Sequence, residues 1–164
     1  MEAMRSAIVI TASNRASAGV YKDLSGAALK EGLTKLGYQV VGHKLVKDDM
    51  HQIATTIRSA IEDQIDLIIT TGGTGISPND VTPEATKPLI ERSIPGIMEA
   101  MRAYSREKVP TADLTRGQAG VNGKSLIINL PGSPGAVKDG LVIIERLAGH
   151  IHDQLAGNDH SASN

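Results

Sequence analysis

The sequence predicts a three-layer α/β domain in which helices cover both faces of a mostly parallel sheet. Short runs of Ile, Val, Leu and Ala, typical of buried strands, alternate with segments whose apolar residues recur at helical spacing. The 164 residues fit one domain, and neither a repeat nor a linker divides them. We therefore expect a single domain over residues 1–156, with the polar residues 157–164 forming a disordered tail.

The first half of the chain predicts three strands and two helices. In chain order these are a buried strand at Ser6–Thr11, a helix at about Leu24–Leu36, a strand at Tyr38–Val46, a helix ending near Glu62, and a short strand at Asp66–Thr70. A Ser/Ala/Gly loop follows the first strand, and Gly37 stops the first helix. Asp48 or Asp49 can cap the second helix.

The second half continues this alternation with two helices. We expect Thr82 to be the N-cap of the first, with Pro83 in its first turn and Pro88 kinking or ending it. The next helix is marked by apolar residues over Ile97–Tyr104. Its methionines, Met98 and Met101, would face the core or a subunit interface.

A hairpin and a long helix complete the expected elements. Asn122-Gly123 is typical of a tight hairpin turn, and we expect both residues to have positive φ. Ser125–Leu130 then reads as a buried strand. Pro134 opens the last helix, whose apolar stripe continues to Leu155.

Composition excludes several function classes. The net charge of −1 gives no basic field for nucleic acid, and the absence of cysteine excludes disulfides, thiolate metal sites and a cysteine nucleophile. The apolar run near the start covers only residues 7–11, too short for a signal peptide or a membrane span, so we expect a cytoplasmic protein. With no Phe or Trp, a bound base would be sandwiched by aliphatic groups and glycine backbone.

The segment TTGGTGISPNDVTPE, residues 70–84, is the first candidate for a binding site. It follows a buried strand, and ligands of open parallel sheets bind at the carboxyl ends of strands. Glycines there can turn sharply and present bare N–H groups to an anion, with hydroxyl side chains adding donors. The residues expected to contact ligand are Thr71, Gly72, Gly73, Thr74, Gly75 and Ser77. The alternative is a tight turn with no ligand.

The segment LPGSPGAV, residues 130–137, is the second candidate and also lies between a buried strand and a helix. The free N–H groups of the helix's first turn, preceded by Pro131, Gly132 and Ser133, can form a second anion site. The alternative is a Pro/Gly loop that only starts a helix. Two such loops after different strands favour one shared pocket.

Acidic residues follow the predicted strands at two places. Asp48 and Asp49 come after the second strand, and Asp80 lies in the glycine-rich loop. Carboxylates beside phosphate-binding loops suit Mg²⁺ that bridges them to a nucleotide, so these acids are candidates for metal binding. One acid of the first pair could instead cap its helix, and Asp80 could hold its own loop.

These segments together resemble the MoaB/Mog family, the molybdopterin adenylyltransferases that also include the G domain of gephyrin. The resemblance runs from about Arg5 to Leu155. It rests on SNRASAGVYKDLSG (13–26), LVKDD (45–49), TTGGTGISPNDVTPEAT (70–86), IPGIMEAMR (94–102) and LTRGQAGVNGKSLIINLPGSPGAV (114–137). The glycine loop with DVTPEAT is the most diagnostic.

The resemblance implies a molybdopterin-binding fold, a homotrimer and a reaction. In that reaction the phosphate of molybdopterin attacks the α-phosphorus of Mg-ATP, giving adenylylated molybdopterin and pyrophosphate. Asp48 and Asp80 match the family's functional aspartates, so the resemblance implies that both are catalytic and bind the metal. The family also includes MoaB-type members that bind molybdopterin without robust adenylylating activity, and a protein that inserts molybdenum is an implied partner.

The chain departs from the family's pattern at the residue that precedes the Asp-Val-Thr-Pro run. Many relatives carry Arg immediately before the Asp-Val-Thr-Pro run, whereas this chain has Asn79. A basic partner for phosphate is then missing, unless Arg116 or Lys87 supplies it.

Overall fold

The computed structural model describes residues 4–158. Its six strands form one sheet in the order β2-β1-β3-β6-β5-β4. The strands are β1 (Ser6–Ala12), β2 (Gln39–Val46), β3 (Leu67–Thr71), β4 (Arg92–Ser93), β5 (Ala119–Asn122) and β6 (Ser125–Leu130). The first four in this order are parallel, and β5 is antiparallel to both of its neighbours, so the predicted mostly parallel sheet is confirmed.

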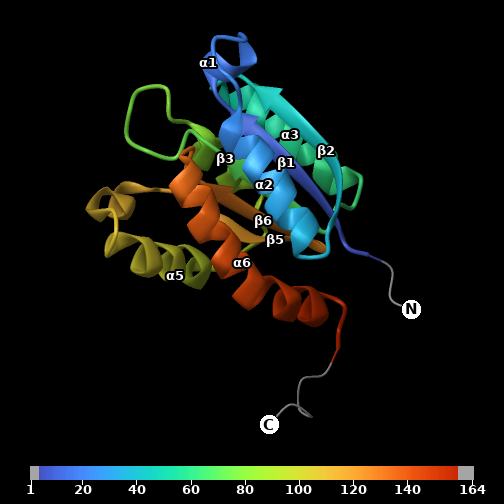
Figure 1. The fold of residues 1–164 in the computed structure, drawn as a ribbon. Helices are drawn as coiled ribbons and strands as arrows, with labels where there is room; N and C mark the ends of the chain where they lie inside the picture. Colours follow the sequence, from blue (N-terminus) through green and yellow to red (C-terminus); the bar gives the residue numbers. More distant parts are fainter. Residues whose placement is uncertain (1–3, 159–164) are drawn as a thin grey trace.

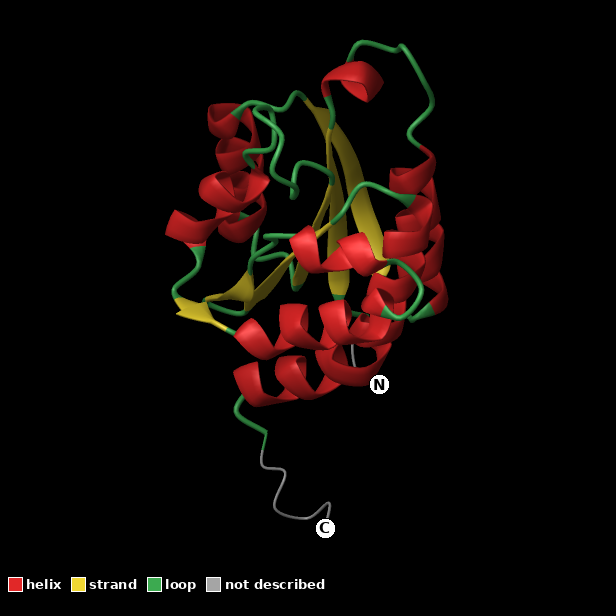
Figure 2. Ribbon diagram, turned by 90° about the vertical axis from the view of Figure 1, so that its left-hand side faces the viewer, coloured by secondary structure: helices red, strands yellow, loops and turns green. Residues whose placement is uncertain are grey.

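Helices cover both faces of this sheet, as predicted (Figures 1 and 2). One face packs against α2 (Leu24–Lys35), α5 (Pro95–Arg106) and α6 (Pro134–Leu155). The other packs against α3 (Met50–Glu62), α4 (Thr82–Thr86) and the 3₁₀ turn η1 (Lys87–Leu89). The remaining short elements are α1 (Asn14–Ser17) and η2 (Pro110–Leu114).

The central strands are buried on both sides, which explains why they read as continuous apolar runs. In β3, Leu67 and Ile69 enter the core beneath α2 and α6, whereas Ile68 enters the core beneath α3. Asn129 is the polar exception in β6, and it is fully buried. Its amide nitrogen donates to Thr70 Oγ1 at 2.9 Å and Thr86 Oγ1 at 3.1 Å, which ties α4 to the sheet.

Two local predictions are wrong. Thr82 is the first residue of α4 and Val81 is the N-cap, because the Thr82 hydroxyl donates to Gly72 O at 3.0 Å instead of capping its own helix. Asn122 pairs with Ser125 at the end of β5, so the hairpin turn consists of Gly123 and Lys124. Of the expected pair, Gly123 alone has positive φ.

The end of α6 docks at the amino ends of β1 and β2, opposite the end of the sheet that carries the cavity described below. His152 is buried, and its Nε2 lies 2.8 Å from the Tyr38 hydroxyl. Arg5 Nη2 donates to Asp153 Oδ1 at 2.7 Å beside this pair. The expected disordered tail falls mostly outside the described residues, and none of the helices described in residues 4–158 is long and apolar enough to cross a membrane.

Candidate functional site

A cavity of about 860 Å³ lies at the carboxyl ends of β1, β3 and β6. This volume falls within the range of roughly 300–1,000 Å³ that is usual for small-molecule sites. Every site residue predicted from the sequence lines it except Ser77: Asp48, Thr71, Gly72, Gly73, Thr74, Gly75, Asp80, Pro131, Gly132 and Ser133. The two glycine-containing loops therefore line the same pocket. This conclusion does not depend on which ligand the pocket binds.

The two loops are joined directly to each other. Gly72 N donates to Leu130 O at 2.9 Å, and Thr71 Oγ1 donates to Pro131 O at 3.0 Å. A Cβ at Gly132 would lie 3.2 Å from Gly72 Cα, so the backbones pack closely. This pairing continues the β3–β6 ladder past the strand ends and fixes the loops as one rigid cradle.

The conformations of the first two loop glycines have an internal cause. Gly72 has φ +96° and Gly73 has φ +69°, both in the left-handed region that favours glycine. A Cβ at Gly72 would collide with Ala12 O, and one at Gly73 with Thr82 Oγ1. The chain thus requires glycine here for its own packing, whether or not a ligand also approaches the backbone.

The adjacent acids after β2 have separate roles. Asp49 is the N-cap of α3 and accepts from Gln52 N at 2.8 Å. Asp48 lines the cavity and forms a reciprocal pair with Asn14: Asn14 N donates to Asp48 Oδ2 at 3.0 Å, and Asp48 N donates to Asn14 Oδ1 at 2.9 Å. Asn14, which the sequence did not single out, therefore orients this carboxylate.

Asp80 lies across the glycine loop from Asp48. Its Oδ2 accepts from Ser77 N at 3.0 Å, so the carboxylate both holds its own loop and lines the cavity. Ser77 supports Asp80 from outside the cavity and is not a lining residue. Burial raises the pKa of Asp48, and the negative charge of Asp80 raises it further. The hydrogen bond from Asn14 N–H lowers this pKa, but burial has the larger effect.

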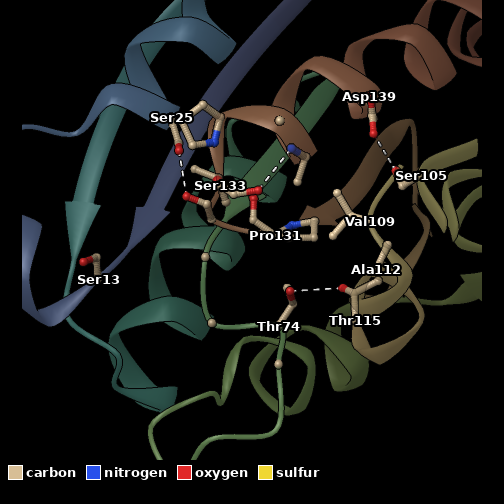
Figure 3. Close-up of a pocket in the computed structure, with 18 of the residues that line it drawn as sticks. Ser13, Ser25, Thr74, Ser105, Val109, Ala112, Thr115, Pro131, Ser133 and Asp139 are labelled. Atoms are coloured by element: carbon tan, nitrogen blue, oxygen red, sulfur yellow. Dashed lines mark hydrogen bonds between the residues drawn. The ribbon is translucent and has the colours of Figure 1, made fainter. Parts of the chain in front are cut away.

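The start of α6 supplies the second part of the cradle (Figure 3). The Ser133 hydroxyl caps the helix by accepting from Ala136 N at 3.1 Å, and Ser25 Oγ donates to Gly132 O at 2.7 Å. Pro134 has no N–H, and the N–H groups of Ala136 and Val137 bond to Ser133. Gly135 N–H is the first-turn donor that Ser133 does not engage, which suits an anion.

The opposite wall was not predicted from the sequence and comes from α5, η2 and α6. Asp139 is buried and accepts from Ser105 Oγ at 2.8 Å and from Lys108 Nζ at 2.7 Å. The bond between Ser105 and Asp139 fixes the end of α5 to α6 (Figure 3), and Lys108 lines the cavity beside it. In the sequence, the only indication of this cluster was an acidic residue, Asp139, on the buried face of a largely apolar helix.

A second unpredicted cluster holds the start of α2. His43 Nε2 lies 2.8 Å from Asp23 Oδ2 and 3.1 Å from Thr11 Oγ1, and Asp23 caps α2 through Gly26 N. A Cβ at Gly26 would collide with Asp23 and His43, so glycine makes room for the pair. Because Asp23 lines the cavity, this cluster fixes the wall between β1 and α2.

The structure places Arg116 and Lys87, the two residues that could replace the missing basic partner for phosphate, outside the cavity. Arg116 Nη1 and Nη2 donate to the Glu84 carboxylate at 2.9 and 3.0 Å, outside the loop. The basic residues that do line the cavity are Lys22, Arg102, Lys108 and Lys138.

Comparisons with known proteins agree with this geometry. A family model described as a probable molybdopterin binding domain matches residues 8–149. A molybdopterin adenylyltransferase of Helicobacter pylori is 43% identical over 92% of this chain and 87% of its own length. The Mog protein of molybdopterin biosynthesis from Mycobacterium ulcerans is 46% identical with a TM-score of 0.87, over 92% of this chain and 99% of that structure. The tungsten cofactor synthesizing protein MoaB from Pyrococcus furiosus is 36% identical with a TM-score of 0.87, over 94% of this chain and 99% of that structure.

Proposed function

Because the chain belongs to the family of probable molybdopterin-binding domains, we propose that it is a molybdopterin adenylyltransferase of molybdenum-cofactor biosynthesis. The observation that carries the proposal is the pair of carboxylates, Asp48 and Asp80, beside a cradle of two joined glycine loops. This is the arrangement that a nucleotidyl transfer needs, because the reaction depends on alignment and charge neutralisation. Several relatives carry the name molybdopterin adenylyltransferase.

The reaction exchanges one phosphoanhydride bond for another. A phosphate oxygen of molybdopterin attacks the α-phosphorus of ATP, and the bond from that phosphorus to the oxygen bridging the α- and β-phosphates breaks. Pyrophosphate leaves with the bonding electron pair, and AMP stays on the pterin phosphate. The backbone N–H groups of the glycine loops and of Gly135 hold phosphate oxygens, and Lys22 and Lys138 on the cavity wall offset their charge.

Asp48 and Asp80 fit a magnesium ion that arrives with ATP. The charge of Asp80 raises the pKa of Asp48, and a cation held by these carboxylates would relieve that repulsion. Residues 4–158 hold no group of three acidic or histidine side chains suited to a metal, so phosphate oxygens and water would complete the coordination. The ion would neutralise charge that develops on the phosphates.

Labelled ATP tests the reaction directly. Incubation with molybdopterin and Mg-ATP should transfer label from the α-phosphorus to the pterin, and label from the γ-phosphorus to pyrophosphate. Mass spectrometry of the pterin should find the added AMP. Pterin that binds but gains no AMP would instead support the MoaB-type role of a binding protein.

We infer further that the protein is a cytoplasmic homotrimer that passes its product to a protein that inserts molybdenum. The resemblance supports this assembly, but the two methionines of α5 are not themselves available for a subunit contact. Met98 and Met101 are each only 3% exposed and pack into the core of their own chain. Val41 and Leu45 are exposed on the edge strand β2 and are better candidates for a subunit contact, and sedimentation equilibrium measures the assembly.

A further inference from the structure

The loop that carries Asp80 stands out from the body of the protein. Residues 74–80 project as the green loop in Figure 1, and Ile76 within this loop is 72% exposed. Within the loop, Asp80 N donates to Ser77 O and Ser77 N donates to Asp80 Oδ2, both at 3.0 Å. The direction of the Asp80 carboxylate therefore depends on the conformation of the whole loop.

Arg116 holds both ends of this loop from outside the cavity. Its Nε donates to Gly75 O at 2.9 Å, and its Nη2 donates to Asp80 O at 3.1 Å. Its backbone N–H donates to Thr74 O at 2.8 Å, and the neighbouring Thr115 hydroxyl donates to Thr74 Oγ1 at 3.1 Å. One residue thus fixes the distance between the start and the end of the loop.

Glu84 fixes Arg116 in turn. Both of its carboxylate oxygens accept from the guanidinium, at 2.9 and 3.0 Å, which is the fork geometry that arginine favours. The hydrogen bond from Arg116 also lowers the pKa of Glu84, because it stabilises the charged form of the carboxylate. Because Glu84 lies in the first turn of α4, the loop is tied to a helix that Asn129 and Thr86 hold to the sheet.

We propose that Arg116 and Glu84 form a positioning clamp that holds Asp80 in place for the metal-nucleotide complex. This inference rests on the proposed function, because it gives Asp80 its task. Arg116 does not line the cavity and so acts through the loop backbone rather than on the substrate. An isolated ion pair this exposed, at 39% and 45%, would contribute little to stability, so its consequence is expected in loop geometry.

Three variants test the clamp. Arg116→Met removes every side-chain contact, and Arg116→Lys keeps the charge but cannot span two carbonyls and a carboxylate. Glu84→Gln keeps Arg116 and weakens its anchor, which serves if Arg116→Met fails to fold. Arg5→Met is the matched control, because Arg5 forms an ion pair with Asp153 at the opposite end of the sheet. The two side chains are 36% and 39% exposed, similar to Arg116 and Glu84.

Amide hydrogen exchange measured without substrates tests directly whether Arg116 holds the loop in place. Arg116→Met should speed exchange of the amides of residues 75–80 about tenfold or more, and Arg5→Met should leave them unchanged. This readout stands even if the wild-type protein transfers no AMP, so failure of the clamp and failure of the proposed function are distinguishable. Unchanged exchange in Arg116→Met would overturn the inference.

Kinetic measurements test whether loss of the clamp slows the reaction. Arg116→Met and Arg116→Lys should both lower kcat about tenfold or more and raise the Mg²⁺ concentration that gives half-maximal rate, because a small misplacement of a reacting group is costly. Dissociation constants for molybdopterin should stay within about twofold of wild type, since the cradle itself is intact. A merely structural role predicts a lower Tm with a normal kcat in the folded protein, and that result, or rescue by lysine, would refute the clamp.

Discussion

At the scale of single residues, Asp48 lines the cavity, and its ionised form lowers the stability of the folded protein. Burial and the charge of Asp80 raise its pKa, so the folded protein binds a proton at this carboxyl more readily than the unfolded chain does. Ionisation of Asp48 therefore disfavours folding at pH values above that raised pKa. Such a cost is usual where a charge is kept for function.

The Asp48→Asn variant separates the effect of this carboxylate on stability from its effect on the reaction. Its Tm at pH 7 should equal or exceed that of wild type, because the amide removes a half-buried charge and its oxygen can still accept from Asn14 N. Its rate should fall by about 10²-fold or more, the scale of a lost charge-stabilising group. A lower Tm with full activity would reverse both assignments.

Gly73 is the second residue whose role can be isolated. Gly73→Ala places a side chain at φ +69° and against Thr82 Oγ1, so it should cost about 1–3 kcal/mol of stability. Gly149→Ala is the matched control, since a Cβ there meets nothing and alanine favours the middle of α6. Urea unfolding should give opposite signs for the two variants. Equal effects would mean that the loop conformation is not strained by a Cβ.

At the scale of elements, the end of α6 is held by a buried pair that responds to pH. Burial lowers the pKa of His152 to about 4, with the positive charge of Arg5 lowering it too. Burial also raises the pKa of Tyr38 to about 12, so the two groups meet as neutral partners. The unfolded chain binds a proton near pH 6.5 that the folded protein excludes down to about 4.

Stability should therefore fall as pH drops from 6.5 toward 4. The stabilisation is fully present above the unfolded pKa, and at pH 5 wild type should have lost roughly 2 kcal/mol through His152. His152→Gln keeps a partner for the Tyr38 hydroxyl but does not titrate, so its unfolding free energy should change less over this range. Urea titrations of both proteins at pH 7.5 and 5 measure the difference. Parallel pH dependence in the two proteins would exclude His152 as the cause.

Most elements were predictable because their patterns are long or their caps are strong. The buried strands β1, β3 and β6 and the amphipathic α3 and α6 stand within a residue or two of their predicted limits. The short α1 and β4 were missed, since neither is long enough to set a period. Thr82 was assigned as a cap because nothing local indicates that Gly72 O takes its hydroxyl.

At the scale of the whole molecule, the site exists because separate segments end at one edge of the sheet. The rule that ligands bind at the carboxyl ends of parallel strands was enough to bring both glycine loops, Asp48 and Asp80 together. The wall with Asp139 and the support of Asp48 by Asn14 could not be predicted, because they depend on side chains far apart in the sequence. The strand order that brings them together is not encoded in any local pattern.

The central claim is that Asp80 acts on the metal-nucleotide complex while the glycine cradle holds the pterin. Asp80→Asn is the sharpest variant, because the amide oxygen can still accept from Ser77 N and keep the loop in place. Asp49→Asn is its control, since Asn caps a helix as well as Asp and Asp49 caps α3.

The decisive measurement is the rate of AMP transfer to molybdopterin by Asp80→Asn, with the dissociation constant for molybdopterin measured on the same protein. The account predicts a rate about 10²-fold or more below wild type, pterin affinity within about twofold, and wild-type values for Asp49→Asn. A folded Asp80→Asn protein that transfers AMP within a few-fold of the wild-type rate would contradict it.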